Sequence, residues 1–284
     1  MTMGRETRDV GREESVRPLL PLSRRERGGV PSGSWGEVPL LAVLLLALAD
    51  DELVIGWSDS EWTGIAPVLE EDVAMSSIAQ DEIGHALAFF ELLSAEAGGT
   101  PDEWAFQREP AEYRCARLVG RGHGDWTRTM ARRFLYETAD AVRLISLEQS
   151  SFAPLANLVA KMRREEQYHL MHVQTWFERF AGGSDEGRER FAAAIAEPWP
   201  DALDLFSSLE GEDELVRDGV LPEPMAALRE RWQAMLAPSL ERLGVDVSAA
   251  RAPGQPRRGG EHPDFAWLHN EMTMVARLEP GATW

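Results

Sequence analysis

Four segments of the chain carry apolar residues at steps of three and four, the spacing that places side chains on one face of an α-helix. These segments cover about residues 37–56, 67–97, 125–149 and 152–181. Glycine pairs follow the second and the fourth segment, at 98–99 and 182–183, and glycine is common just after a helix end. The pattern therefore predicts four helices, each several turns long.

The connections between these segments differ in length. The first two segments are joined by a short stretch, as are the last two, whereas residues 98–124 form a long crossover with several prolines and glycines. Two tightly joined helix pairs linked by a long connection are typical of ferritin-like bundles. We expect an all-α fold, with a ferritin-like four-helix bundle over residues 37–183. Additional C-terminal helices are predicted within 184–210, 223–243 and 261–278.

Residues 1–36 differ from the rest in composition. They mix arginine, glutamate, glycine, serine and proline without an apolar stretch, which predicts a disordered arm and no secretory signal. We therefore expect one helical domain over residues 37–284. Its segment 244–263, rich in arginine, proline and glycine, predicts a loop.

Each of the four predicted bundle helices carries a glutamate in the middle of its apolar face. The four are Glu52, Glu82, Glu137 and Glu166. A histidine follows three residues after the second and the fourth of them, at His85 and His169, and residues i and i+3 share a helix face. Acids are almost never fully buried unless they are paired or bind a metal. The six side chains are thus candidate metal ligands in the bundle core.

Separate buried salt bridges are the alternative interpretation. Two like charges about 4 Å apart repel by roughly 1 to 4 kcal/mol, and four acids in one core would repel in several pairs. The helical spacing places the nearby basic residues off the apolar faces: Arg132, Arg133, Lys161, Arg163 and Arg164. Two divalent ions would neutralise four carboxylates, which favours a dinuclear site. Mixed oxygen and nitrogen ligands suit iron or manganese.

We expect the first glutamate–glutamate–histidine set (Glu52, Glu82, His85) to hold one ion and the second set (Glu137, Glu166, His169) to hold the other, with some carboxylates bridging. Three further acids could orient the ligands, with a solvated helix face as the equal alternative: Asp81, Asp140 and Glu165. Two tyrosines that adjoin the candidate ligands in sequence, Tyr136 and Tyr168, are interpreted as packing residues. His172 is interpreted as an ordinary partly buried histidine, with a position at the border of the site as the alternative.

Composition narrows the partners. The net charge of −19 argues against nucleic acid, because phosphate binding needs a basic surface. The apolar run at 39–49 is too short to span a membrane. A single cysteine, Cys115, suits a reducing cytoplasm. There is no glycine-rich phosphate loop, which argues against a nucleotide- or flavin-binding domain on this chain. Redox chemistry at an iron site would then need electrons from another protein, a separate reductase.

Three stretches of the sequence resemble the phenylacetic acid catabolic proteins, the paired large subunits of the bacterial ring-1,2-phenylacetyl-CoA epoxidase. They are Ser60–Ala86, Tyr168–Gly182 and Glu271–Trp284. In these stretches the chain is most similar to the structural subunit, PaaC, whose usual pattern has glutamine where His85 stands. At the candidate ligands it instead resembles the catalytic subunit, PaaA, with Glu137 standing where that subunit has an aspartate. The resemblance extends over residues 38–284.

The resemblance implies a subunit of a multicomponent di-iron oxygenase of phenylacetate catabolism, which would activate O2 and act on an aryl-CoA thioester. It also implies a reductase and a PaaA-like homologous subunit, or a second copy of this chain, as partners. The alternative is a PaaC-type scaffold that performs no chemistry itself. Basic residues of the crossover are candidates for the CoA group: Arg114, Arg117 and Arg121.

Overall fold

The computed structural model describes residues 39–247, 258–259 and 262–279. Its long helices are α1 (Leu40–Ser60), α2 (Leu69–Ala97), α4 (Trp126–Leu147) and α5 (Ala153–Ala181). No β-strand occurs within these described ranges, so the predicted all-α class is confirmed. The predicted arm over residues 1–36 lies outside the described residues, as does most of the predicted loop at 244–263.

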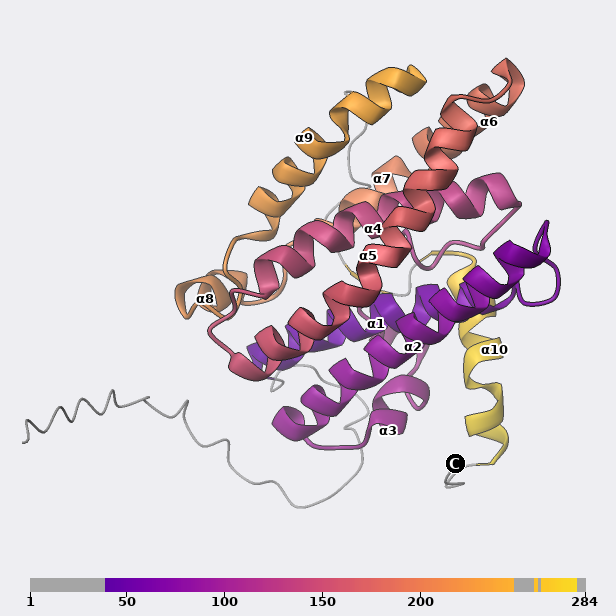
Figure 1. Cartoon of the computed structure of the whole chain (residues 1–284). Helices are drawn as coiled ribbons and strands as arrows, with labels where there is room; N and C mark the ends of the chain where they lie inside the picture. The colour runs from indigo at the N-terminus through magenta and orange to yellow at the C-terminus, as the bar shows by residue number, and fades with distance from the viewer. Residues whose placement is uncertain (1–38, 248–257, 260–261, 280–284) are drawn as a thin grey trace, which may run out of the picture.

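The four long helices form a ferritin-like bundle. α1 packs along α2, α4 packs along α5, and contacts between α2 and α5 join the two pairs (Figure 1). The crossover between the pairs contains the short helix α3 (Pro101–Phe106) and a 3-10 turn (Pro110–Glu112). Thr100 and Glu103 cap α3 reciprocally, because the hydroxyl of Thr100 accepts from the backbone of Glu103 while the carboxylate of Glu103 accepts from the backbone of Thr100.

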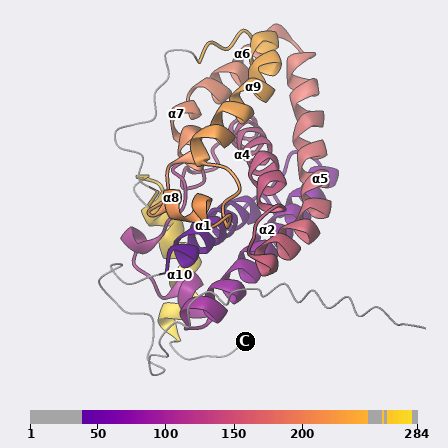
Figure 2. The same cartoon turned by 90° about the vertical axis from the view of Figure 1, so that its left-hand side faces the viewer.

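The predicted C-terminal segments are helical. They contain α6 (Asp185–Ala196), α7 (Trp199–Ala202), a 3-10 turn (Leu203–Phe206), α9 (Met225–Leu243) and α10 (Phe265–Leu278). The short helix α8 (Glu212–Arg217) lies between two of these segments and was not predicted. α6 and α9 pack on α4, whereas α10 packs on α1 and α3 (Figure 2). Within the described residues no helix combines the length and the apolar character that a membrane crossing requires.

Helix α1 is enclosed by its neighbours along most of its length. Its apolar residues Leu44, Leu45 and Val54 are completely buried, and α2, α8 and α10 all contact it. A helix covered in this way buries its polar residues too, and such residues need partners. The partners of the acids on α1 therefore decide what each acid does.

The predicted end of the first helix at Gly56 is wrong, because α1 continues to Ser60. A Cβ atom at Gly56 would lie only 2.7 Å from the Cβ of Glu82 on α2. The glycine is thus required by the close approach of α2 rather than by a helix end. This close approach brings Glu82 next to the acids of α1.

Candidate metal centre

The six predicted ligands meet in the middle of the bundle. Ligand atoms of one set lie within 4.8 Å of one another, and so do those of a second set. The first set is Glu52, Glu82, His85 and Glu166, and the second is Glu82, Glu137 and His169. Glu82 belongs to both sets, as expected for a bridging carboxylate. Glu166 joins the first set rather than the second, although its Oε1 is also 3.4 Å from Nδ1 of His169.

Each of the six side chains has one buried nitrogen or oxygen atom that makes no hydrogen bond of good geometry among the described residues, although two of these atoms, Nδ1 of His85 and Oε1 of Glu166, lie 3.1 Å apart. These atoms are Glu52 Oε2, Glu82 Oε2, His85 Nδ1, Glu137 Oε2, Glu166 Oε1 and His169 Nδ1. Buried polar atoms are normally hydrogen-bonded, and exceptions need an explanation. Six such atoms at one place, of the types that iron and manganese accept, fit a metal centre.

Two acids at the edge of the cluster orient the histidines. Nε2 of His85 on α2 lies 2.8 Å from Oε2 of Glu165 on α5, and Nε2 of His169 on α5 lies 3.2 Å from Oδ2 of Asp81 on α2. Each acid directly precedes a ligand glutamate and contacts the histidine of the other helix. A proton held at Nε2 leaves the lone pair on Nδ1, which faces the cluster. The predicted orienting contacts of Asp81 and Glu165 are therefore present.

Without a metal, the cluster retains protons. Burial raises the pKa of Glu52 well above its usual range, and the charge of Glu82 raises it further. Burial alone would lower the pKa of His85, but the carboxylates of Glu166 and Glu52 outweigh it and raise the pKa to about 12. The pKa of His169 rises to about 10 for the same reason, here through Glu166 and Glu82. Metal ions binding at these atoms would displace protons.

The prediction that Arg133 lies off the apolar face is wrong. Its side chain is fully buried, and Nη2 donates to Oε1 of Glu82 at 2.7 Å and also to Oε1 of Glu137. Nη1 donates to Asp59 on α1. Nearly every side of α4 is covered by the bundle or by α6 and α9. The buried part of its surface is therefore wider than the positions of its apolar residues indicate. The spacing of four residues between Arg133 and Glu137 could have predicted this contact, because residues i and i+4 are neighbours on a helix.

Arg132 is buried as well, whereas the basic residues of α5 remain outside the core. Arg132 donates to Asp59 at 2.6 Å and to Ser58 at 3.1 Å. Lys161 and Arg164 are exposed, as predicted. Arg163 is half-buried and pairs with Glu148.

The remaining residues near the predicted ligands fall into several environments. Asp140 pairs with Arg143 at 2.7 Å, and burial raises its pKa to about 7 against the opposing effect of that arginine. Tyr136 is buried in the core, which confirms its predicted packing, whereas Tyr168 is 69% exposed and does not pack. His172 pairs with Glu71 at 2.7 Å, as an ordinary partly buried histidine would.

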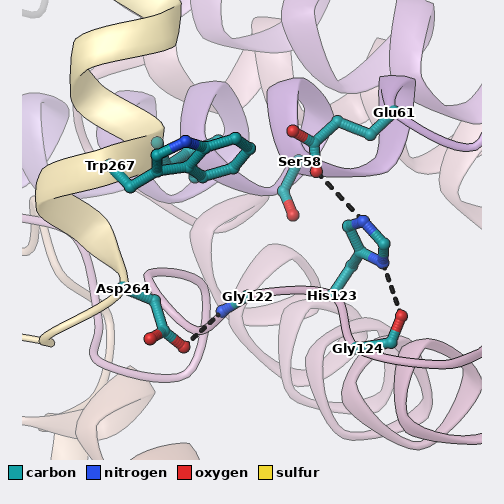
Figure 3. A pocket seen from close by; sticks show the side chains of 8 residues that line it. Ser58, Glu61, Gly122, His123, Gly124, Asp264 and Trp267 are labelled. Atoms are coloured by element: carbon teal, nitrogen blue, oxygen red, sulfur yellow. Dashed lines mark hydrogen bonds and ion pairs between the residues drawn. The ribbon is translucent and has the colours of Figure 1, made fainter.

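A separate pocket lies beside the C-terminal end of α1 (Figure 3). Its lining is formed by Ser58, Glu61, Gly122, His123, Gly124, Asp264, Trp267 and Leu268. Glu61 pairs with His123 at 3.2 Å, and Asp264 accepts from the backbone of Gly122 at 2.9 Å. These polar groups are hydrogen-bonded to protein partners, unlike the candidate ligand atoms in the bundle core.

Two of the arginines predicted as candidates for a CoA group have structural partners instead. Arg117 and Arg121 both bind Asp201, at 3.1 and 2.5 Å, and Arg121 also binds Glu197. They join the crossover to the C-terminal helices. These contacts give no support for a role of either residue in CoA binding.

Comparison with known proteins gives one family and two curated relatives. The model of a family described as phenylacetic acid catabolic protein matches residues 37–284. The chain is 29% identical to the PaaC component of 1,2-phenylacetyl-CoA epoxidase from Escherichia coli (strain K12) over 246 residues, which cover 86% of this chain and 99% of PaaC. It is 24% identical to the PaaA component of the epoxidase from the same organism over 204 residues, covering 70% of this chain and 65% of PaaA.

Proposed function

Because the chain belongs to the phenylacetic acid catabolic protein family, we propose that it is a metal-binding component of a phenylacetyl-CoA epoxidase-like oxygenase of phenylacetate catabolism. The observation that carries this proposal is the cluster of six buried, convergent ligand atoms without hydrogen-bond partners among the described residues. A scaffold that had lost its metal would be expected to fill these positions with paired or apolar side chains.

The cluster is suited to two metal ions that share Glu82, with iron as the first choice and manganese as the alternative. Bound iron would supply the activation of O2, a chemistry that side chains cannot provide. His85 and His169 would each present Nδ1, held in place by Glu165 and Asp81.

The surrounding apolar residues would exclude water from the centre. Met75, Phe89, Met130 and Val159 are completely buried at helix positions above and below the ligands. A dry site strengthens the electrostatic interactions within it and protects reactive species from side reactions.

The same proposal requires other components. Electrons would come from a separate reductase, and an aryl-CoA thioester would be the substrate. The partner would be a PaaA-like homologue or a second copy of this chain. The cytoplasmic location expected from the single cysteine stays a prediction, and Cys115 itself is a buried free thiol.

A non-catalytic, PaaC-type structural component is the second candidate function. The sequence comparison favours this function, because the match to PaaC, at 29% identity, covers 99% of that protein, whereas the match to PaaA covers 65% of that protein. In this case the chain would pair with a catalytic homologue that binds the substrate. The metal ligands would then have been kept without turnover on this chain.

Metal analysis of the full chain, purified alone from iron-replete cells, tests the proposal. We expect iron or manganese in the protein, loss of the metal in Glu82→Ala, whose carboxylate belongs to both sets, and a lower metal content in His169→Ala, whose imidazole belongs to the second set. His172→Ala is the matched control, since this residue lies one turn further along α5 but pairs with Glu71 instead of the cluster. A well-folded, metal-free wild-type protein would favour the structural role. Full metal retention in both ligand variants would contradict the ligand assignment.

A further inference from the structure

We propose that Arg133 makes the two metal positions unequal, so that the first set of ligands takes an ion readily and the second set takes one only against a buried guanidinium. The proposal rests on the metal-binding function inferred above. It concerns how this chain loads its metals, and it follows from three features of Arg133: its contacts, its anchoring and its charge.

The contacts of Arg133 fall mainly on the second ligand set. Nη2 donates to the Oε1 atoms of Glu82 and Glu137, two of the three members of that set. In the first set it reaches Glu82 alone, which the two sets share. The guanidinium nitrogen therefore lies between two carboxylates that would hold a second ion. The remaining oxygens of Glu82 and Glu137 are still free of hydrogen bonds within the described structure.

The guanidinium is anchored in this place. Nη1 of Arg133 donates to Oδ2 of Asp59, while Arg132 donates to the other oxygen, Oδ1, at 2.6 Å. All three residues are buried, with at most 3% of each exposed to solvent. Withdrawal of Arg133 would break its bond to Asp59 or require α1 and α4 to move. An arginine also does not lose its charge in a protein, so deprotonation cannot clear the position.

Charge favours a first ion more than a second one. The four glutamates of the cluster carry four negative charges if all are ionised, and Arg133 adds one positive charge because Arg132 already balances Asp59. One divalent ion then leaves the cluster with a single negative charge. A second divalent ion would leave a net positive charge in the core, which is costly there. Without Arg133 the same two ions would give a neutral cluster.

Titration of the metal-free full chain with Mn2+ alone tests the inference. The wild type is expected to bind one Mn2+ at least tenfold more tightly than a second one. In Arg133→Gln the two affinities should come within about threefold of each other. Arg128→Gln is the control: it removes another arginine of α4, one that pairs with Glu197 and touches neither Asp59 nor a ligand glutamate, so it should titrate as the wild type does.

Thermal unfolding supplies a readout that does not depend on activity. Metal-free Arg133→Gln should melt below the metal-free wild type, since it leaves the glutamates without their counter-charge. Saturating Mn2+ should raise the melting temperature of this variant more than that of the wild type, because a ligand stabilises only the folded state that binds it.

A second variant keeps the inference testable if Arg133→Gln does not fold. Glu137→Gln removes an acid from the second set alone, so the tight ion should remain and the weak one should be lost. Loss of the tight ion in this variant would overturn the inference. So would two equal Mn2+ affinities in the wild type, a result that leaves the proposed function intact. Absence of any Mn2+ binding in the wild type and all variants would overturn both.

Discussion

Three consecutive acids on α1 have different surroundings although all are buried. Asp50 accepts from Nη1 of Arg108 at 2.9 Å and from the backbone of Arg114 at 2.6 Å. Asp51 likewise binds two arginines, Arg143 and Arg258. Glu52, the next residue, faces the candidate metal cluster instead: its Oε2 lies 3.9 Å from Nδ1 of His85 and makes no hydrogen bond within the described structure.

The comparison separates acids that stabilise the fold from acids that are available to a ligand. Chemical class, helix and burial are the same for both kinds, so none of these properties distinguishes them. The distinction lies in whether buried cations of the protein match the charge. Glu82 and Glu137 are intermediate, because Arg133 matches one oxygen of each and leaves the other free.

The largest expected effect comes from removing an acid that is paired with a buried arginine. Asp50→Ala leaves Arg108 buried without its carboxylate, and the loss of one partner of a buried ion pair costs about 3 to 5 kcal/mol. We expect the free energy of unfolding, measured by urea denaturation, to fall by this amount. The loss should be the same with and without Mn2+. A decrease of less than about 1 kcal/mol would show that Asp50 and Glu52 do not differ in the way proposed.

The adjacent ligand position should respond in the opposite way. Burial and the charge of Glu82 raise the pKa of Glu52, which favours its neutral form in the metal-free protein. Glu52→Gln keeps a neutral side chain of the same size, so the metal-free protein should be as stable as the wild type or more stable. The wild type should gain about 2.7 kcal/mol in unfolding free energy at a metal concentration about one hundred times the dissociation constant, and the variant should lose most of this gain. Urea denaturation with and without Mn2+ measures both. A variant that is destabilised without metal and still stabilised by it would contradict this role.

The close packing of α1 against α2 can be tested at Gly56. Gly56→Ala places a methyl group against the Cβ of Glu82, and overpacking of this kind costs about 1 to 3 kcal/mol. The variant should unfold at lower urea concentration and bind Mn2+ more weakly, because α2 has to shift. Gly84→Ala is the control on α2, where a Cβ would meet no atom within 4 Å. Equal behaviour of the two variants would argue against the close approach.

The smallest expected effects on stability concern the acids that contact the histidines. Asp81→Asn and Glu165→Gln should each lower Mn2+ affinity by about tenfold to a hundredfold, the usual result of removing an acid that orients a ligand histidine. Unfolding without metal should hardly change, because both side chains are partly exposed. Glu91→Gln, an exposed acid on α2, provides the comparison in the same titration. An affinity no lower than that of this control would mean that the two contacts do not position the histidines.

The fold class, the four long helices and the six candidate ligands could all be predicted from the sequence. The reason is that each of these features depends on local spacing: apolar residues at steps of three and four, a glutamate within each apolar face, and a histidine three residues after two of these glutamates. Such patterns need no knowledge of which helices touch. Helix ends were less accurate, as Gly56 demonstrates, because a glycine can serve a close helix crossing as well as a helix end.

Only the tertiary structure shows which buried acids pair with arginines and which do not. The bonds from Arg133 to Glu82, from His169 to Asp81 and from Arg258 to Asp51 join residues that are 51, 88 and 207 positions apart. No local pattern encodes such pairings, since each depends on how two or more helices pack. The candidate ligands could therefore be predicted from spacing, and Asp81 and Glu165 could be named as candidate acids for orienting them. The arginine beside the cluster, and the histidine that each of these acids contacts, were set by the packing of α1, α2, α4 and α5.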